Sequence, residues 1–373
     1  MGVMNKDLLM WDETLFRDYE LFELDHIPEY FAHRELQMQS LMFCVKPAFR
    51  GASPINVLCM GPPGTGKTTA VHKLFEEIEK STSKVVPVYI NCQTNSTRFS
   101  VFSQIFKKLF KISPPSSGVS FKKIYEQITQ HLADEEKVLI TALDDINYLF
   151  HEGEEEKVLY SLLRAHETKP GARIGVISIH SETGPEFHFD PKIESVYLPE
   201  DIRFLRYSQD EIRDILKNRI KMGFFPNVMD LEVLEKVVEY TEMLGDLRVG
   251  IDLLKRSALN AEKRASKSIT LEDVENSYET SRLVHLTYLL KSLKNEEKIL
   301  LELITDSSDI TAGDLYKGFS SKTGLGYTRY YETLGKLSAL KLIEANFTGK
   351  GTRGRSRIIS LRYGPEEIKK RLK

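Results

Sequence analysis

Two kinds of hydrophobic periodicity divide the chain. Up to about residue 205, short apolar runs that predict buried strands alternate with segments in which apolar residues recur every three or four positions, as in helices. The predicted strands are residues 55–60, 85–91, 138–143, 173–179 and 202–204. Strands that alternate with helices favour a parallel sheet with helices on both faces. The sequence therefore predicts an α/β fold for this part of the chain.

Beyond residue 208 the strand pattern stops, and helical periodicity predicts a small all-α region. Its predicted helices are residues 209–222, 230–243, 247–263 and 271–281. From residue 283 onwards, further helices are predicted at 284–291, 295–305, 311–320 and 327–339, followed by a β-hairpin of 342–347 and 357–362. Three helices followed by a hairpin are typical of the winged form of helix-turn-helix. We therefore predict three domains, at residues 12–205, 206–282 and 283–373.

Residues 61–68, Gly-Pro-Pro-Gly-Thr-Gly-Lys-Thr, match the phosphate-binding loop (P-loop) of nucleotide triphosphatases. The motif lies between a predicted strand and a helix predicted at 69–81, which is the context that it requires. Its glycines allow backbone N–H groups to turn towards phosphate oxygens, and the helix dipole adds to the attraction. Lys67 is predicted to meet the β- and γ-phosphates, and Thr68 to hold Mg²⁺. The residues predicted to contact ATP or ADP here are Gly61, Pro62, Pro63, Gly64, Thr65, Gly66, Lys67, Thr68 and Thr69.

Two further features complete the predicted nucleotide site. Ile27 and Pro28 precede the P-loop strand, and apolar residues in such a place often form one wall of an adenine pocket. The third predicted strand ends in Asp144-Asp145, about 75 residues after the P-loop. An apolar strand closed by an acidic pair is typical of the Walker-B element, in which Asp144 would hold Mg²⁺ through water. Asp145 stands where a Glu normally polarises the attacking water.

Composition and charge change this picture only at the C-terminal end. Charged residues make up 28% and the hydrophobic set 41% of the 373 residues, ordinary values for a globular protein. No apolar run predicts a membrane span, and no secretory signal is apparent. The three cysteines have no metal-ligand spacing, which favours a reducing cytoplasm. The net charge is −2, but residues 283–373 carry 17 Lys and Arg against 10 Asp and Glu, a net +7, which leaves −9 for residues 1–282. This asymmetry suggests a polyanionic partner at the C-terminal end.

Basic residues gather at the tip of the predicted hairpin, at Lys350, Arg353, Arg355 and Arg357. A glycine-rich basic tip suits a wing that follows DNA phosphates, although a solvated basic hairpin would show the same pattern. The helix before the hairpin opens with Thr328, Arg329 and Tyr330, which we predict to enter the major groove. Arg329 can pair with guanine through two hydrogen bonds, or it can contact phosphate alone. Tyr330 and Tyr331 are adjacent, so at least one of them is expected to pack into the core.

Together these features resemble the archaeal family of origin-recognition and cell-division-control replication initiators, which are AAA+ ATPases. The resemblance covers residues 16–362. It is based on the P-loop, Asp144-Asp145, Asp190-Pro191-Lys192 (similar to the family's Asp-Pro-Arg), Gly245-Asp246-Leu247-Arg248 (similar to Gly-Asp-x-Arg) and Tyr327-Thr328-Arg329. It implies an AAA+ core, a helical lid and a winged-helix domain that binds DNA.

The resemblance also assigns further roles and shows departures from the family pattern. Arg248 would be the sensor-2 arginine that reaches the γ-phosphate from the lid. Ser181 stands at the sensor-1 position, usually Asn, and the adjacent His180 could serve instead. Asp145 replaces a Glu, and Lys192 stands at the arginine-finger position. Lysine lacks the planar fork that clamps phosphate oxygens, so hydrolysis should be slow.

The two helices predicted between strands 85–91 and 138–143 match the family's initiator-specific insertion. Its predicted DNA contacts are Arg98, Lys122 and Lys123; alternatively, the insertion only packs. Our first hypothesis is an initiator that binds duplex DNA at a replication origin, uses ATP as a slow switch, and works with the replicative helicase and other initiator subunits. An AAA+ remodeller or loader with a protein-binding C-terminal module, and a nucleotide-binding DNA-binding regulator, are the alternatives.

Overall fold

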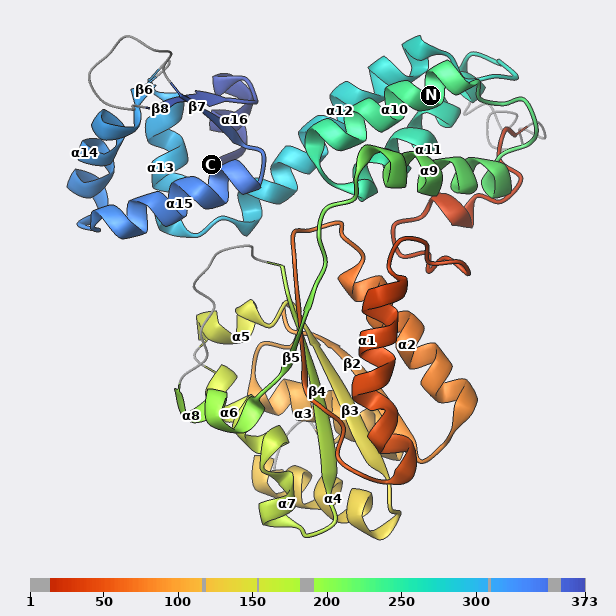
Figure 1. Cartoon of the computed structure of the whole chain (residues 1–373), viewed down its shortest axis with the longest axis vertical. Helices are drawn as coiled ribbons and strands as arrows, with labels where there is room; N and C mark the ends of the chain where they lie inside the picture. The colour runs from red at the N-terminus through yellow and green to blue at the C-terminus, as the bar shows by residue number, and fades with distance from the viewer. Residues whose placement is uncertain are drawn as a thin grey trace, which may run out of the picture. The chain divides into compact units, whose positions relative to one another are not determined.

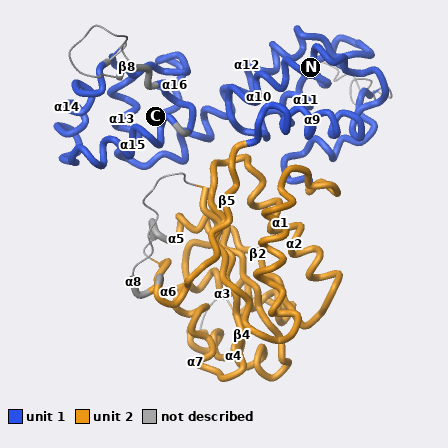
Figure 2. Tube along the Cα trace, in the orientation of Figure 1, with its two compact units in different colours: residues 1–26, 207–373 blue, residues 27–206 orange. Residues whose placement is uncertain are grey.

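A computed structural model describes residues 14–115, 119–152, 154–181, 191–307, 310–347 and 357–372 of the chain. Their contacts group into two compact units, residues 27–206 and residues 1–26 together with 207–373, each of which is described by itself (Figure 2). Within the described residues, none of the helices combines the length and the apolar character needed to cross a membrane.

The unit of residues 27–206 is built on a five-stranded sheet (Figure 1). Its strands are β1 (Val57–Met60), β2 (Val85–Asn91), β3 (Val138–Asp144), β4 (Arg173–His180) and β5 (Glu200–Arg203). Their order in the sheet is β2-β3-β4-β1-β5, and every neighbouring pair is parallel. The parallel α/β fold predicted from the alternating pattern is confirmed. This order also brings the ends of β1, β3 and β4 to one edge of the sheet, and the nucleotide motifs follow those strands.

Helices cover both faces of this sheet (Figure 1). Buried strand residues alternate between the two hydrophobic layers. In β3, Ile140 and Ala142 pack towards one face, whereas Leu139 and Leu143 pack towards the other. The helices are α1 (Glu35–Val45), α2 (Lys67–Ser81), α3 (Arg98–Phe110), α4 (Phe121–Asp134), α5 (Asn147–Glu152), α6 (Glu155–Leu163), α7 (Ala165–Thr168) and α8 (Pro191–Tyr197). α1 and α2 cover the first face; α3, α4 and α6 cover the second.

The second unit begins with four helices, α9 (Gln209–Gly223), α10 (Leu231–Leu244), α11 (Leu247–Lys263) and α12 (Leu271–Ser292). The prediction of separate helices at 271–281 and 284–291 is wrong, because α12 runs through both without a break. The residues between them, Arg282 and Leu283, include no helix breaker, and Leu286 and Leu290 continue the buried face. The predicted domain boundary at residue 283 therefore falls inside a helix, and the division into three domains stays a prediction.

The C-terminal part of this unit combines helices with a small antiparallel sheet (Figure 1). Its elements are α13 (Asn295–Thr305), β6 (Ile310–Thr311), α14 (Ala312–Thr323), α15 (Tyr327–Ala339), β7 (Ile343–Phe347), β8 (Arg357–Leu361) and α16 (Pro365–Leu372). The strand order is β6-β8-β7. The predicted helices and hairpin are present, while β6 and α16 were not predicted. A two-residue strand is too short to produce an alternating pattern.

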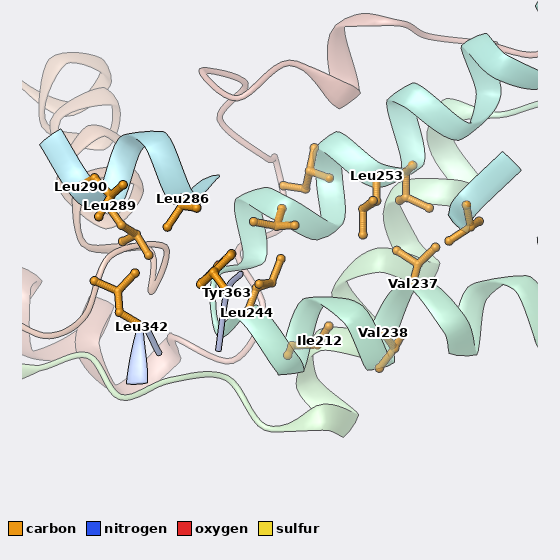
Figure 3. Close-up of a cluster of buried hydrophobic side chains, with 14 of the residues drawn as sticks. Ile212, Val237, Val238, Leu244, Leu253, Leu286, Leu289, Leu290, Leu342 and Tyr363 are labelled. Atoms are coloured by element: carbon orange, nitrogen blue, oxygen red, sulfur yellow. The ribbon is translucent and has the colours of Figure 1, made fainter. Parts of the chain in front are cut away.

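One hydrophobic core runs through the second unit. Leu253 of α11, Leu286 of α12, Leu342 before β7 and Tyr363 after β8 all belong to it (Figure 3). The N-terminal residues 14–26 join the same core, where Phe22 stacks on Phe224 with ring centroids 4.4 Å apart. These residues were assigned to the domain of residues 12–205 from sequence, but their contacts are with the helices of the second unit.

Candidate functional site

The P-loop depends on three glycines with positive φ. Gly61, Gly64 and Gly66 have φ of 154°, 72° and 90°, values that residues with a side chain rarely adopt. Gly61 also has no room for a side chain, because an added Cβ would lie 2.1 Å from the carbonyl oxygen of Phe204, which follows β5. Gly66 precedes the first residue of α2, Lys67, so the helix begins two residues earlier than predicted. The glycines therefore allow the backbone conformation of the phosphate-binding loop that the motif predicts.

The side chain of Lys67 is buried and folds back over this loop. Its Nζ atom donates to the carbonyl oxygens of Gly61 and Pro62, both at 2.8 Å. The hydroxyl of Thr65 also donates to the carbonyl oxygen of Pro62, at 2.8 Å. The N-terminal end of α2, with its positive dipole, begins at Lys67 itself. A cation and a helix N-terminus are thus held together where the motif binds phosphate.

The Walker-B residue Asp144 lies at the end of β3, where three donors hold its carboxylate. The Thr68 hydroxyl donates to Oδ2 at 2.8 Å, and the Tyr89 hydroxyl donates to the same oxygen at 2.6 Å. The backbone N–H of Asp145 donates to Oδ1 at 3.0 Å. The two residues predicted to hold Mg²⁺, Thr68 and Asp144, are therefore in direct contact. Tyr89 is a third residue in this hydrogen-bonded group, and sequence reasoning missed it.

Asp145 and Ser181 meet beside this pair. β4 lies between β3 and β1, so the residue that follows it comes to the same edge of the sheet as the Walker-B element. The Ser181 hydroxyl donates to Asp145 Oδ1 at 3.0 Å. His180, which was considered as an alternative to Ser181, is buried within β4. Of these two residues, Ser181 is therefore the one whose hydrogen bond to Asp145 the structure shows.

Asp144 shapes the chemistry of its neighbours. Burial and the adjacent Asp144 carboxylate raise the pKa of Tyr89, so its hydroxyl stays protonated and donates. The His72 ring packs on the Tyr89 ring with centroids 4.3 Å apart, and burial lowers the pKa of His72. Burial also raises the pKa of Cys59, in β1, to about 12, so this thiol is not a reactive nucleophile at neutral pH.

Arg34 anchors the P-loop from outside, which sequence reasoning missed. The residue is buried, and its guanidinium donates from Nε to the Thr65 carbonyl at 2.9 Å. One terminal nitrogen donates to the Leu205 carbonyl at 2.7 Å and the other to the carbonyl of His33 at 2.7 Å. Arg34 therefore joins the loop to the chain that leaves β5, through backbone groups that carry no sequence signal.

The predicted adenine-wall residues lie beside α2. Ile27 and Pro28 are both half-buried. The Nζ atom of Lys73, on α2, donates to the carbonyl oxygens of Pro28 and Glu29, both at 2.8 Å. This tether keeps the 27–29 segment on the helix that follows the P-loop.

The Gly-Asp-x-Arg motif lies in the second unit, and its first two residues form the junction between α10 and α11. Gly245 ends α10 with φ of 69°, and Asp246 caps α11 by accepting from the N–H of Arg248 at 2.9 Å. Arg248 is the second residue of α11, and its side chain is exposed. His285 of α12 faces the same buried carboxylate, with Nδ1 3.9 Å from Asp246 Oδ2.

The two helices of the predicted insertion, α3 and α4, cover one face of the sheet with their buried residues. The guanidinium of Arg98 lies 3.9 Å from the centre of the Phe121 ring, a cation–π contact. Lys122 and Lys123 are exposed, and Lys122 Nζ lies 3.8 Å from a carboxylate oxygen of Glu126. The lysines are thus available to a partner, whereas Arg98 also has a packing contact within the unit.

Helix α15 corrects one of the three predicted base contacts. Tyr330 has no exposed surface, and its hydroxyl donates to the carbonyl oxygen of Ala312 at 2.7 Å. It is a core residue and cannot reach a base, because the face of the helix that carries it packs on α14. Thr328 is exposed, as predicted for a residue that meets DNA. Tyr331 is also exposed.

Arg329, the third predicted base contact, pairs with two carboxylates. Its guanidinium lies 2.8 Å from an oxygen of Glu296, on α13, and 3.1 Å from an oxygen of Glu332. The side chain is 39% exposed. The ion pairs raise the pKa of Arg329. Burial alone would raise the pKa of Glu296, but its contacts, chiefly the hydrogen bond from Arg329, outweigh this effect and lower it. Arg329 must exchange these partners before it can pair with guanine or phosphate.

Several predicted site residues lie outside the described part of the chain. These are Lys350, Arg353 and Arg355 of the hairpin tip. For Lys192, in α8, and Arg357, at the start of β8, the structure describes the backbone but not the side chain.

Comparison with known proteins identifies the family of the chain. The family model for an AAA ATPase domain matches residues 30–177, and the model for a Cdc6 AAA+ ATPase-type lid domain matches residues 213–279. A protein of Methanosarcina acetivorans, ORC1-type DNA replication protein 2, is 53% identical over 97% of both chains. The chain belongs to the ORC1-type DNA replication proteins. It is therefore an AAA+ ATPase of DNA replication, and the family resemblance inferred from its motifs is confirmed.

Other relatives support the same family and fold. ORC1-type DNA replication protein 3 of Haloarcula marismortui is 49% identical over 98% of both chains. The Aeropyrum pernix ORC2 protein, solved as ADPNP-ADP complexes, has a TM-score of 0.72 at 24% identity, over 95% of this chain and 97% of that one. The Aeropyrum pernix ORC1 protein, solved in complex with DNA, has a TM-score of 0.68 at 24% identity, over 97% of both chains. At this identity the two structures show the shared fold.

Proposed function

We propose that this ORC1-type protein recognises duplex DNA at a replication origin and that bound nucleotide acts as a slow switch between two states. The observation that carries the proposal is the contact of Thr68 with Asp144, 2.8 Å apart, in a chain that also ends in a helix-and-hairpin module. The first feature supports nucleotide binding by the unit of residues 27–206. The second supports DNA binding by the other unit, whose residues 283–373 carry a net charge of +7.

In the nucleotide site, the P-loop residues from Gly61 to Thr69 would bind the phosphates of ATP or ADP. Lys67 would exchange its carbonyl partners for phosphate oxygens, because a charged acceptor attracts an ammonium more strongly than a neutral carbonyl. Ile27 and Pro28 would contact the adenine ring. Arg248, from the lid, would contact the γ-phosphate as sensor 2, so the lid would respond to the difference between ATP and ADP.

The donor set suits Mg²⁺. Thr68 and Asp144 offer a hydroxyl and a carboxylate 2.8 Å apart, and oxygen ligands are those that Mg²⁺ prefers. These two residues would hold the ion, Thr68 directly and Asp144 through water. When bound, the ion would neutralise negative charge on the nucleotide's phosphates.

Hydrolysis is proposed to be slow. Asp145 would orient the attacking water, with Ser181 holding its carboxylate through the 3.0 Å hydrogen bond. The aspartate is one methylene shorter than the family's usual glutamate, so it reaches less far towards the water. Lys192, at the finger position, would offer a single point charge to a neighbouring subunit's nucleotide in place of a planar fork.

DNA binding is proposed for the module of residues 283–373. Thr328 and Arg329 at the start of α15 would face the major groove, and Lys350, Arg353, Arg355 and Arg357 would follow phosphates along the wing. Lys122 and Lys123, with Arg98, would add contacts from the core. We further propose that the protein acts in the cytoplasm and recruits the replicative helicase, together with other initiator subunits.

Footprinting of the protein on genomic fragments, together with pull-down of the replicative helicase, tests this function. Protection of a discrete origin segment that depends on ATP, with capture of the helicase, is the expected result. Protection without helicase capture would favour a DNA-binding regulator. Helicase capture without protection would favour a remodeller or loader whose C-terminal module binds protein, and would overturn the proposed origin recognition.

A further inference from the structure

Asp144 has a hydrogen-bonding partner that is neither a P-loop residue nor a neighbour in sequence. Tyr89 lies in β2, opposite Ala142 of β3, and its hydroxyl donates to Asp144 Oδ2 at 2.6 Å. The same oxygen accepts from Thr68 at 2.8 Å. Two donors on one oxygen, with the Asp145 N–H on the other, fix the orientation of the carboxylate.

The three donors differ in what nucleotide binding would require of them. Thr68 is itself the residue that would hold Mg²⁺, so its hydroxyl would offer an oxygen lone pair to the ion as well as its proton to Asp144. The Asp145 N–H belongs to the backbone and contacts only Oδ1 in this set. Tyr89 is therefore the side-chain donor to Asp144 Oδ2 whose role is separate from binding the ion.

Tyr89 is itself held in place from α2. His72 lies one helical turn after Thr68, on the same face of α2. Its ring packs on the ring of Tyr89 with centroids 4.3 Å apart. Because α2 carries both Thr68 and His72, the helix that holds the metal-binding hydroxyl also fixes the residue that orients the metal-binding carboxylate.

We propose that Tyr89 is a positioning residue for Mg²⁺: its hydroxyl holds the Asp144 carboxylate in the orientation that receives the ion with ATP, and the His72 ring holds Tyr89. This inference rests on the proposed function, because it assumes that Mg²⁺ and ATP bind at this site. Groups that orient metal ligands typically change metal affinity by about 10- to 100-fold when they are removed.

The test measures how strongly Mg²⁺ tightens binding of a fluorescent ATP analogue to the full-length protein. Affinity is measured in EDTA and across a Mg²⁺ series, for the native protein and for Tyr89→Phe. The substitution keeps the ring on His72 and removes only the hydroxyl. Tyr125→Phe is the matched control, because it also removes a hydroxyl that hydrogen-bonds, to the Ser161 carbonyl at 2.7 Å, in the same unit.

Tyr89→Phe should leave the affinity for the ATP analogue in EDTA within about twofold of the native value. It should reduce the gain in this affinity that Mg²⁺ produces by about tenfold. Tyr125→Phe should change neither. An unchanged gain in Tyr89→Phe, or an equal loss in EDTA and in Mg²⁺, would overturn the inference, because the hydroxyl would then have no role or only a packing role. If the native protein fails to bind the analogue in any condition, the proposed function itself fails.

A double-mutant cycle tests the route of the effect. In an Asp144→Ala background, which removes the acceptor of the Tyr89 hydroxyl, adding Tyr89→Phe should leave the Mg²⁺-dependent gain in affinity where Asp144→Ala alone puts it, because Tyr89 acts through Asp144. A further loss of the same size as in the native background would mean that Tyr89 acts elsewhere and would contradict the assignment.

Discussion

The P-loop and helix α15 each carry a cation that we propose to meet a phosphate or a base, and the two cations contact different kinds of acceptor. Lys67 donates to the carbonyl oxygens of Gly61 and Pro62, whereas Arg329 pairs with the carboxylates of Glu296 and Glu332. A phosphate that takes Lys67 from these two carbonyl oxygens replaces neutral acceptors with a charged one. A phosphate or base that takes Arg329 must compete with two negative charges, so the net gain is smaller. The carbonyl contacts of Lys67 therefore cost less to give up than the carboxylate contacts of Arg329.

The largest expected effect comes from Lys67→Ala. Removing the ammonium should weaken ATP binding by at least about 100-fold, because a charge-assisted contact to phosphate is lost in a buried site. Titration calorimetry measures this directly. Lys80→Ala, at the exposed end of the same helix, is the matched control and should bind ATP as the native protein does. Lys80 pairs across one helical turn with Glu77.

Arg34→Ala should be the next largest change and should act on stability. It would leave the carbonyls of Thr65, Leu205 and His33 without their charged donor. We expect a loss of about 3 kcal/mol in the free energy of unfolding of the nucleotide-binding unit, from lost charge-assisted hydrogen bonds. Urea unfolding, followed by the loss of binding of a fluorescent nucleotide, measures this free energy. A loss below about 0.5 kcal/mol would show that Arg34 does not anchor the loop.

Tyr330→Phe tests the correction made on α15. If Tyr330 is a core residue, losing its hydrogen bond to Ala312 should lower the free energy of unfolding by about 1 kcal/mol. Discrimination among single-base variants of the DNA site should stay as in the native protein. Relaxed discrimination at one position, with stability unchanged, would return Tyr330 to the DNA interface.

The smallest expected effect is that of Arg329. Because its guanidinium is shared with Glu296 and Glu332, Arg329→Ala should weaken DNA binding by less than about tenfold. Glu296→Gln should strengthen binding slightly, by releasing the arginine. A panel of single-base variants then separates the two roles: a base contact relaxes discrimination at one or two positions, whereas a phosphate contact weakens all sites equally.

The pair of Arg329 with Glu296 also has a defined pH dependence. The folded-state pKa of Glu296 is lowered, so the pair stabilises the fold fully above the unfolded pKa of about 4.3 and is lost as the pH falls through the lower folded value. Between pH 6 and 8 the pair is therefore intact, and DNA affinities measured in that range refer to a paired Arg329.

The sequence allowed prediction where a motif constrains neighbouring backbone. The glycines of the P-loop and the Gly245-Asp246 junction between α10 and α11 have conformational requirements that few residues meet, so their roles follow from residue type. The strand pattern predicted the parallel sheet, and in the structure this sheet brings Thr68, Asp144 and Ser181 to one edge.

Prediction failed for residues whose partners are set by packing between segments that are distant in sequence. Arg34 binds carbonyl groups, which every residue has, so no side-chain pattern points to it. Tyr89 reaches Asp144 only through the pairing of β2 with β3. Tyr330 and Arg329 are consecutive on one helix, and only the packing of α15 on α13 and α14 decides that the first is buried and the second paired.

The most direct test of the nucleotide switch is DNA affinity in defined nucleotide states. Fluorescence anisotropy on the footprinted duplex would compare the full-length protein with ATP and Mg²⁺, with ADP and Mg²⁺, and without nucleotide. A switch predicts that affinities in the ATP and ADP states differ by at least about fivefold. Lys67→Ala should give one affinity in all three. Equal affinities of the native protein in all three states would contradict the account.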